Sequence, residues 1–209
     1  MREDTKTLLF AAIVCVTCSL LLSGAAAGLK SRQQANEEFD VKRNIIKAFG
    51  IDISELTRPD IEEKFEQHVS KQNADGLELY VWTDEGADQP SKYAFPVSGK
   101  GLWSMLYGYL SLESDLETIA GISFYKHGET PGLGAEIEKP WFQSQFTGKK
   151  LYQNGAAVEF TVAKPDPAED GETEVDGISG ATLTGKGVEA LIRKDAIAYA
   201  EFFNSIKGK

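Results

Sequence analysis

A run of small and hydroxyl-bearing residues, Asp176-Gly-Ile-Ser-Gly-Ala-Thr-Leu-Thr184, leads into an amphipathic segment that predicts a helix. It follows a polar, proline-bearing stretch at 165–171. A turn of small residues at the start of a helix exposes several backbone N–H groups, and the helix dipole favours an anion there. Thr182 would place a hydroxyl in the middle of that anion site. A plainer interpretation is a glycine-containing turn with Thr184 as the N-cap of the helix.

Two further stretches are rich in glycine. His127-Gly-Glu-Thr-Pro-Gly-Leu-Gly134 holds three glycines and a proline, and Gly99-Lys-Gly-Leu-Trp-Ser104 holds two glycines beside a tryptophan. Glycine allows positive φ and a close approach of the backbone to a flat ligand. The alternatives are an ordinary Pro-Gly turn between a strand and a helix, and a tryptophan that anchors the core.

The segment Asp-x-x-Ser-Gly-Ala-Thr that ends at Thr182 resembles the sequence at which a flavin transferase attaches FMN to threonine through its phosphate. The three stretches follow one apolar N-terminal span, and together they resemble the C subunit of the sodium-translocating NADH:quinone reductase. The resemblance implies a single membrane helix, a periplasmic FMN-binding domain and one covalent FMN on Thr182. It also implies electron transfer from NADH toward quinone, coupled to sodium export, with other subunits of a membrane complex as partners.

The resemblance assigns roles to the residues of the attachment motif. Asp176 would help the flavin transferase at the moment of transfer, or would cap the turn. Ser179 and Thr184 would hydrogen-bond the phosphodiester, or would only cap the helix. Gly180 and Ala181 would leave room for the phosphate and for the active site of the transferase, which acts on the chain during maturation.

The two glycine-rich stretches would contact the rest of the flavin. Thr130 and backbone N–H groups would bind the polar edge of the isoalloxazine, and Leu133 and Trp103 would pack on its faces. Glu129 would hold the amides of its own loop or seat the ribityl chain. The flavin-contacting residues expected in these stretches are Leu102, Trp103, Glu129, Thr130, Leu133 and Gly134.

Two other functions compete with this one. The G subunit of the Rnf ferredoxin:NAD complex shares the attachment motif, although the Gly-Leu-Trp-Ser segment favours the quinone reductase. From another class, a membrane-tethered binding domain that never carries flavin would show the same anchor and turns. We expect no residue of this chain to act as a catalytic acid, base or nucleophile, so a stand-alone flavoenzyme is the weakest candidate.

An apolar span near the N-terminus predicts a membrane anchor. Residues 7–28 contain no charged side chain, and about 22 residues at about 1.5 Å each reach across a hydrocarbon core of roughly 30 Å. A cleaved signal peptide is the alternative, but its apolar region is usually shorter. Lysines and arginines flanking the span lean weakly toward a cytoplasmic domain, whereas the resemblance places the domain in the periplasm of a bacterial inner membrane.

Composition excludes several classes. The 209-residue chain carries a formal net charge of −10, which argues against binding nucleic acid. It has two histidines, and both of its cysteines, Cys15 and Cys18, fall inside the apolar span. No zinc or haem spacing is present. A redox role must therefore use an organic cofactor or a metal held by a partner.

The remaining pattern predicts an α+β domain: a short tail at 1–6, the span, a helical connector at 29–75 and an FMN-binding domain at 76–209. A four-residue apolar repeat predicts a helix near 61–69, and Trp141 of a later helix is expected to point inward. The other expected elements are strands near 77–82, 92–97, 118–125 and 158–162, and helices at 136–146 and 188–206.

Overall fold

The computed structural model describes residues 3–74, 76–164 and 171–207. Two compact units divide the chain, one over residues 1–40 and the other over residues 41–209. The proline-bearing stretch expected at 165–171 lies outside the described residues except for Gly171, as does position 75, the expected end of the connector. All of the predicted site residues fall in the second unit.

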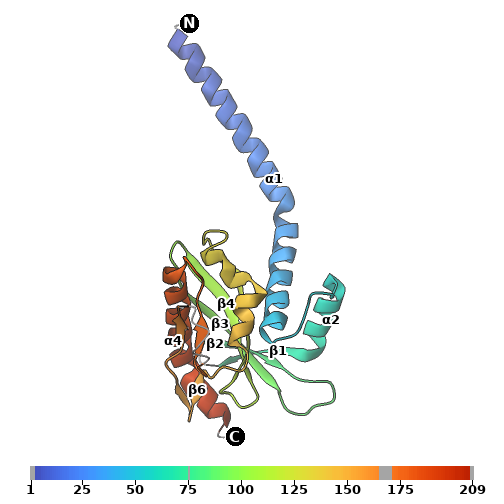
Figure 1. The fold of residues 1–209 in the computed structure, drawn as a ribbon. Coiled ribbons are helices and arrows are strands. Elements are labelled where there is room, and N and C mark those ends of the chain that lie inside the picture. The colour runs from blue at the N-terminus through green and yellow to red at the C-terminus, as the bar shows by residue number, and fades with distance from the viewer. Residues whose placement is uncertain (1–2, 75, 165–170, 208–209) are drawn as a thin grey trace. The chain divides into compact units, whose positions relative to one another are not determined.

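The first unit is described as a single helix, the N-terminal part of α1 (Glu3–Ala48; blue in Figure 1). Its large apolar side chains are exposed; Leu8 and Leu22, for example, are each 71% exposed. Within the described residues, α1 is the one helix long and apolar enough to cross a membrane. Protein does not cover this apolar surface. Because a lipid bilayer would cover it, α1 is consistent with membrane association.

A five-stranded antiparallel sheet forms the centre of the second unit, in the order β1-β2-β3-β4-β5. Side chains along a strand alternate between the two faces of a sheet. Phe95, Leu110 and Ile122 lie opposite one another on three neighbouring strands, and all three are buried. The strands are β1 (Val69–Ala74), β2 (Leu77–Trp82), β3 (Lys92–Lys100), β4 (Met105–Glu113) and β5 (Ile119–Lys126).

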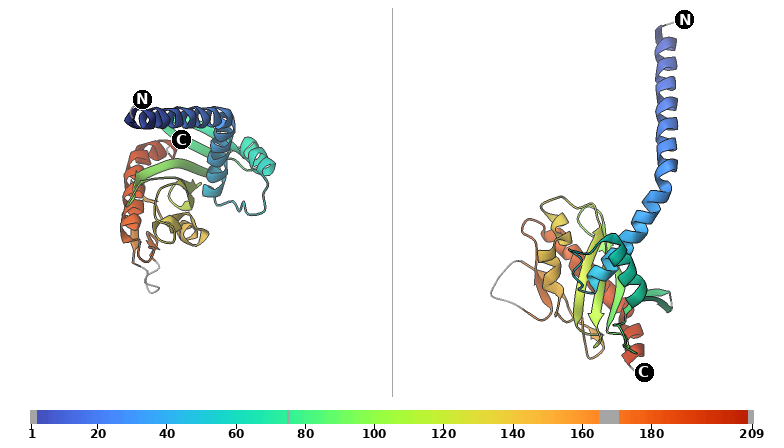
Figure 2. Two further views of the ribbon diagram at one scale, coloured as in Figure 1. Left: turned by 90° about the horizontal axis from the view of Figure 1, so that it is seen from above. Right: turned by 90° about the vertical axis from the view of Figure 1, so that its right-hand side faces the viewer.

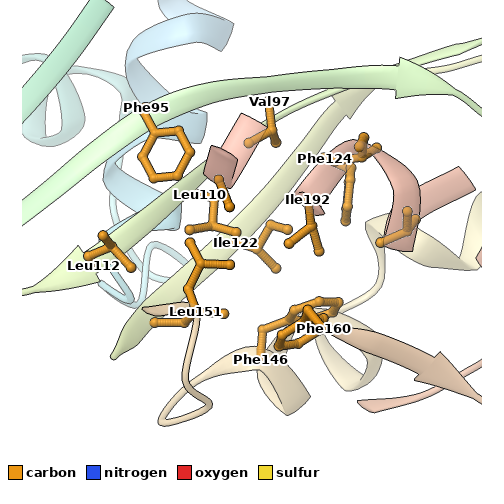
Figure 3. Close-up of a cluster of buried hydrophobic side chains, with 14 of the residues drawn as sticks. Phe95, Val97, Leu110, Leu112, Ile122, Phe124, Phe146, Leu151, Phe160 and Ile192 are labelled. Carbon is orange, nitrogen blue, oxygen red and sulfur yellow. The ribbon is translucent and has the colours of Figure 1, made fainter. Parts of the chain in front are cut away.

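The main core lies between one face of this sheet, helix α4 (Thr182–Lys207) and the segment that joins β5 to α4. Figure 3 shows Ile192 of α4 together with Phe146 and Phe160 of the joining segment, near the strand side chains. Burying a side chain of this size stabilises the fold by about 1.5–3 kcal/mol. This core holds the first turn of α4 in place relative to the sheet.

The end of α1 and helix α2 (Arg58–His68) lie on the other face of the sheet from α4 (Figures 1 and 2). The Ser111 hydroxyl donates to the carbonyl of Ala48, and Lys92 Nζ donates to the carbonyl of Phe49 at 2.8 Å. These bonds satisfy carbonyls that have no partner inside the helix. The compact domain therefore starts at Val41, within the stretch that the sequence placed in a connector at 29–75.

The sheet also begins earlier than the sequence predicted. Helix α2, which the sequence placed near 61–69, runs from Arg58 to His68, and Val69 opens strand β1, which pairs with β2. The sequence pattern missed β1 because its Ser-Lys-Gln-Asn run is polar, as edge strands often are. Pairing with β2 overrides the four-residue repeat that had placed Val69 in the helix.

The helix expected at 136–146 is broken into η1 (Gly134–Glu138), α3 (Pro140–Gln143) and η2 (Ser144–Phe146). Lys139 has an extended backbone, because the residue before a proline avoids the helical region. The break turns Trp141 outward, where it is 47% exposed, while Ile137 and Phe142 are buried. The prediction of an inward Trp141 was wrong for this reason.

Short strands complete the domain and lead to the predicted attachment motif: β6 (Tyr152–Gln153), β7 (Ala156–Ala157), β8 (Thr161–Ala163) and β9 (Glu174–Asp176). β8 pairs with β9 in parallel. It is shorter than the strand expected at 158–162 and starts later. Helix α4 begins at Thr182, six residues before the expected start at 188. The prediction started too late because small residues such as Gly185 and Gly187 gave a weak helical signal. The domain is α+β, as predicted.

Candidate functional site

The predicted attachment motif forms a tight turn between β9 and α4. The turn begins where the N–H of Gly177 donates to the carbonyl of Ala163 at 2.8 Å, and it includes Gly180 at a φ of 77°. Glycine adopts this left-handed conformation at little cost. The N–H of Gly185 then makes a helical bond to the carbonyl of Ala181 at 3.0 Å. The backbone N–H groups of residues 182–184 precede this bond and point to the start of the helix.

Residues of the motif differ sharply in exposure. Thr182, Ser179 and Gly180 are exposed, whereas Ala181 is 4% and Thr184 is 1% exposed. The Thr184 hydroxyl donates to Oε2 of Glu129 at 2.7 Å, so it does not cap the helix. The interpretation of Thr184 as an N-cap was therefore wrong: Thr184 lies inside the first turn of α4 and faces the protein interior.

A pocket of about 610 Å³ opens beside Thr182. Its walls come from the end of β8, the turn at 177–181 and the first turn of α4. Lys164 and Lys186 both line it, and both are exposed. Lys186 also pairs with Glu189 at 2.9 Å. An anion held near Thr182 would meet these two positive charges as well as the N-terminus of α4.

The sequence interpretation missed both lysines. Lys186 had a usable signal, because it follows Thr182 by four residues and thus lies on the same side of a helix. Lys164 had none, since only the pairing of β8 with β9 brings it to the pocket.

Glu129 is buried and joins the two glycine-rich stretches to α4. Its carboxylate accepts hydrogen bonds from the backbone N–H groups of Leu102 (3.3 Å), Trp103 (2.9 Å) and Ser104 (3.1 Å), in addition to the bond from Thr184. Burial acts to raise the pKa of Glu129, but these hydrogen bonds outweigh it and hold the pKa below its ordinary value. Glu129 therefore binds the amides of the β3–β4 turn, not those of its own loop, and its alternative role toward the ribityl chain stays a prediction.

Glycines around Glu129 make room for protein atoms. A Cβ on Gly101 would lie 2.7 Å from Oε1 of Glu129, and one on Gly134 would lie 2.5 Å from the Thr184 hydroxyl. A Cβ on Gly99 would lie 2.5 Å from Cβ of Leu191 in α4. At these three positions the missing side chain leaves room for the helix and the carboxylate, and contact of the glycine backbone with a flat ligand stays a prediction.

Four large apolar side chains on the β3–β4 turn, the loop at 127–134 and the first turn of α4 are exposed. Leu102 is 40%, Trp103 71%, Leu133 42% and Leu183 62% exposed. A Cβ on Gly180 would lie 3.0 Å from Cδ2 of Leu133, so the loop at 127–134 touches the attachment turn. Trp103 is thus not an anchor of the core, which had been the alternative to a ligand contact.

The loop that carries Leu133 is closed by its own backbone. The carbonyl of Thr130 accepts the N–H groups of Leu133 and Ala135, each at 3.1 Å, and Gly132 has a φ of 74°. The exposed Thr130 therefore opens a tight turn that brings Leu133 beside Gly180 and Gly134 against Thr184.

Gln145 holds the start of the attachment turn, which the sequence interpretation did not foresee. Its side-chain amide donates to the carbonyl of Asp176 at 3.3 Å and accepts from the N–H of Asp176 at 2.8 Å. The two bonds fix the peptide groups on both sides of Asp176 at the end of β9. Gln145 lies in η2, and nothing in the local sequence marks it as a partner of Asp176.

Comparisons with known proteins match the part of the chain that contains this site. A family model described as an FMN-binding domain matches residues 101–196. The chain is similar to the C subunit of the Na(+)-translocating NADH-quinone reductase of Vibrio campbellii, with 34% identity over 88% of this chain and 87% of the relative. The C subunit of the same reductase from Pseudomonas aeruginosa is 33% identical over 91% of this chain and 90% of the relative.

Solved structures are similar as well. The crystal structure of the Na(+)-translocating NADH-quinone reductase C subunit from Parabacteroides distasonis aligns with a TM-score of 0.72 at 33% identity, covering 83% of this chain and 96% of that one. Shewanella oneidensis NqrC aligns with a TM-score of 0.74 at 24% identity, covering 84% of this chain and 100% of that one, and shows the same fold.

Proposed function

Because the chain belongs to the C-subunit family of the Na+-translocating NADH-quinone reductase and has an FMN-binding domain, we propose that it holds one FMN covalently on Thr182. The bond would be a phosphoester between the threonine oxygen and the phosphate of FMN. The observation that carries the proposal is the exposed Thr182 at the N-terminus of α4, inside the residues that the FMN-binding model matches.

The space and the charges beside Thr182 fit such a group. Pockets for ligands of this size are about 300–1,000 Å³, and the pocket beside Thr182 lies within that range. The N–H groups at the start of α4 favour a phosphate, and Lys164 and Lys186 add positive charge. The small residues Gly180 and Ala181 would keep the phosphate accessible, and Ser179 lies exposed beside it.

The isoalloxazine would lie on the exposed apolar residues around the motif. Leu102 and Trp103 are exposed on the turn that binds Glu129, and the exposed Leu133 approaches Gly180 of the motif. Thr130 opens the turn that places Leu133, and Gly134 allows that loop to approach Thr184. FMN, when bound, supplies the electron-transfer chemistry, and the protein orients the ring and sets the surrounding electrostatics.

Attachment would occur once, during maturation. A flavin transferase would use FAD as the donor: the Thr182 oxygen bonds to the phosphorus of the FMN half, the P–O–P bond breaks, and AMP leaves. The proton of the threonine hydroxyl passes to the transferase. In this proposal Gln145 and Asp176 present the turn, because they fix its backbone at the end of β9.

In the complex, we propose that the bound flavin carries electrons from NADH toward quinone, coupled to Na+ export, with other subunits as partners. Residues 7–28 would anchor the chain in the bacterial cell membrane with the domain on the periplasmic side. A covalent bond suits that side, since a carrier there cannot draw on a cytoplasmic FMN pool. An Rnf-type role remains an alternative that shares the same attachment, and a domain without flavin is the alternative from another class.

Intact mass and in-gel fluorescence of the denatured protein test the attachment. The full chain, Thr182→Ala and the matched control Ser179→Ala would each be expressed with and without a flavin transferase. We expect added mass of one FMN and fluorescence only with the transferase, both lost in Thr182→Ala and retained in Ser179→Ala. A wild-type chain that stays unmodified beside an active transferase would favour the domain without flavin.

The carrier role has its own test. The chain has no nucleotide-binding glycine fingerprint, so NADH should react at another subunit. The purified, flavin-loaded chain should be reduced by dithionite and not by NADH. Rapid reduction of the isolated chain by NADH would contradict the role of a carrier.

A further inference from the structure

Glu129 is the meeting point of three segments that are far apart in the sequence. It belongs to the loop at 127–134, it binds the N–H groups of the turn at 102–104, and it accepts the hydroxyl of Thr184 at 2.7 Å in the first turn of α4. The residue is 5% exposed. Its own N–H donates to Nδ1 of His127 at 3.2 Å, which helps to fix the loop on which it is carried.

The negative charge of Glu129 persists at this position. The donors that bind it are backbone amides and the hydroxyls of Thr184 and Ser104, all of which are neutral. Neutral donors stabilise a buried carboxylate without cancelling its charge. Thr184, which binds it, lies in the same helical turn as Thr182. A full negative charge is therefore hydrogen-bonded to the helical turn that carries the proposed attachment oxygen.

The surrounding backbone is shaped for a side chain of this size. A Cβ on Gly101 would approach Oε1 of Glu129 to 2.7 Å, and a Cβ on Gly134 would approach Oε2 to 2.8 Å. Glutamine has the same shape as glutamate but no charge. Glu129→Gln therefore removes the charge and keeps the packing, and the amide nitrogen that replaces one oxygen no longer accepts a hydrogen bond.

We propose that Glu129 is a positioning residue of the flavin site, which holds the β3–β4 turn with Leu102 and Trp103 against the first turn of α4 and lowers the reduction potential of the flavin through its charge. The inference rests on the proposed attachment of FMN to Thr182. The first part follows from the hydrogen bonds. The second follows from Coulomb's law, because a nearby negative charge opposes the addition of an electron.

A redox titration of the flavin-loaded full chain tests the proposal. Wild type, Glu129→Gln, Thr184→Val and the control Glu201→Gln would be co-expressed with a flavin transferase, and the midpoint potential measured by spectroelectrochemistry. Glu201 is exposed on α4, so solvent screens its charge. Intact mass first establishes that each variant carries FMN.

The expected shifts have opposite signs. Glu129→Gln removes the charge and should move the midpoint to more positive potential, by more than Glu201→Gln does. Thr184→Val removes one donor, leaves the charge less compensated and should move the midpoint to more negative potential. A purely structural role predicts no such pair of shifts. Midpoints of Glu129→Gln and Thr184→Val that equal wild type would overturn the proposal.

Two further outcomes are distinguishable. If Glu129→Gln does not fold, the Thr184→Val shift alone decides, and an unchanged midpoint there rejects the inference. If the wild-type chain carries no FMN although the transferase modifies a control substrate, the attachment proposal fails, and with it the premise of this inference.

Discussion

The exposed and buried sides of the first turn of α4 contrast within three residues. Thr182 lies exposed beside a pocket lined by two lysines, whereas Thr184 is 1% exposed and bonded to Glu129. The sequence treats both as hydroxyls of one motif. The structure places the Thr182 hydroxyl at the accessible site and the Thr184 hydroxyl in the hydrogen bond that joins α4 to Glu129. In the proposed function, residues of one short motif thus serve attachment on one side and packing on the other.

The largest expected effects come from truncating each threonine. Thr182→Ala should abolish flavin attachment and change the free energy of unfolding by less than about 0.5 kcal/mol, as surface substitutions usually do. Thr184→Ala should retain attachment but cost about 1–3 kcal/mol, because a buried carboxylate loses a donor. Denaturant unfolding of the chains without flavin, together with intact mass, measures both. Equal losses in the free energy of unfolding of the two variants would contradict this difference between Thr182 and Thr184.

Packing between α4 and the sheet gives the next effect. A Cβ on Gly187 would lie 2.6 Å from the carbonyl oxygen of Lys100 and 3.0 Å from Cα of Gly101. Gly187→Ala should therefore push the helix from the β3–β4 turn and destabilise the domain by about 1–3 kcal/mol. The exposed Glu201→Ala on the same helix is the control. A Gly187→Ala variant as stable as wild type would mean that the turn moves freely, contrary to the proposal that the β3–β4 turn is held against α4.

Acid should destabilise the domain by protonating the buried Glu129. The pKa of Glu129 is lowered in the folded chain, so its contribution is present above the unfolded value of about 4.3 and is lost as the pH falls through the lower folded value. Wild type should lose stability more steeply than Glu129→Gln below about pH 4.3. Equilibrium unfolding from pH 7 to pH 3 measures the two slopes. Parallel slopes would show that Glu129 does not bind a proton in this range.

Gln145→Ala tests whether Gln145 holds the attachment turn in place. It removes two hydrogen bonds to the backbone of Asp176, each of which contributes about 0.5–1.5 kcal/mol. We expect slower flavin attachment in a time course followed by mass, together with a modest loss of stability. The exposed Gln153→Ala serves as the control. An unchanged attachment rate would remove Gln145 from the site.

The smallest effect is expected from the exposed charge of Lys186. Lys186→Met should slow attachment about two- to fivefold at low salt, which matches the roughly 0.2–1 kcal/mol typical of exposed ion pairs. The difference should shrink at high salt because salt screens exposed charges. Arg193→Met, also exposed on α4, is the control. A salt-independent effect would point to a contact other than charge.

The sequence by itself determined much of this protein. The apolar run, the α+β pattern and the order of the three stretches identified the family and placed Thr182 at the start of a helix. These features are local: a helix start, a glycine turn and a run of apolar residues can each be read within one segment. Strand β1 escaped notice because its polar residues carry no local strand signal.

Only the tertiary structure decided what the residues around Thr182 do. Glu129 could have bound its own loop or a ligand, and the choice of the β3–β4 turn and Thr184 depends on how α4 packs on the sheet. The same packing filled the space beside Gly99 and Gly101, and the pairing of β8 with β9 brought Lys164 to the pocket. Contacts between distant segments follow from the packing of the whole core, so no local pattern could have predicted them.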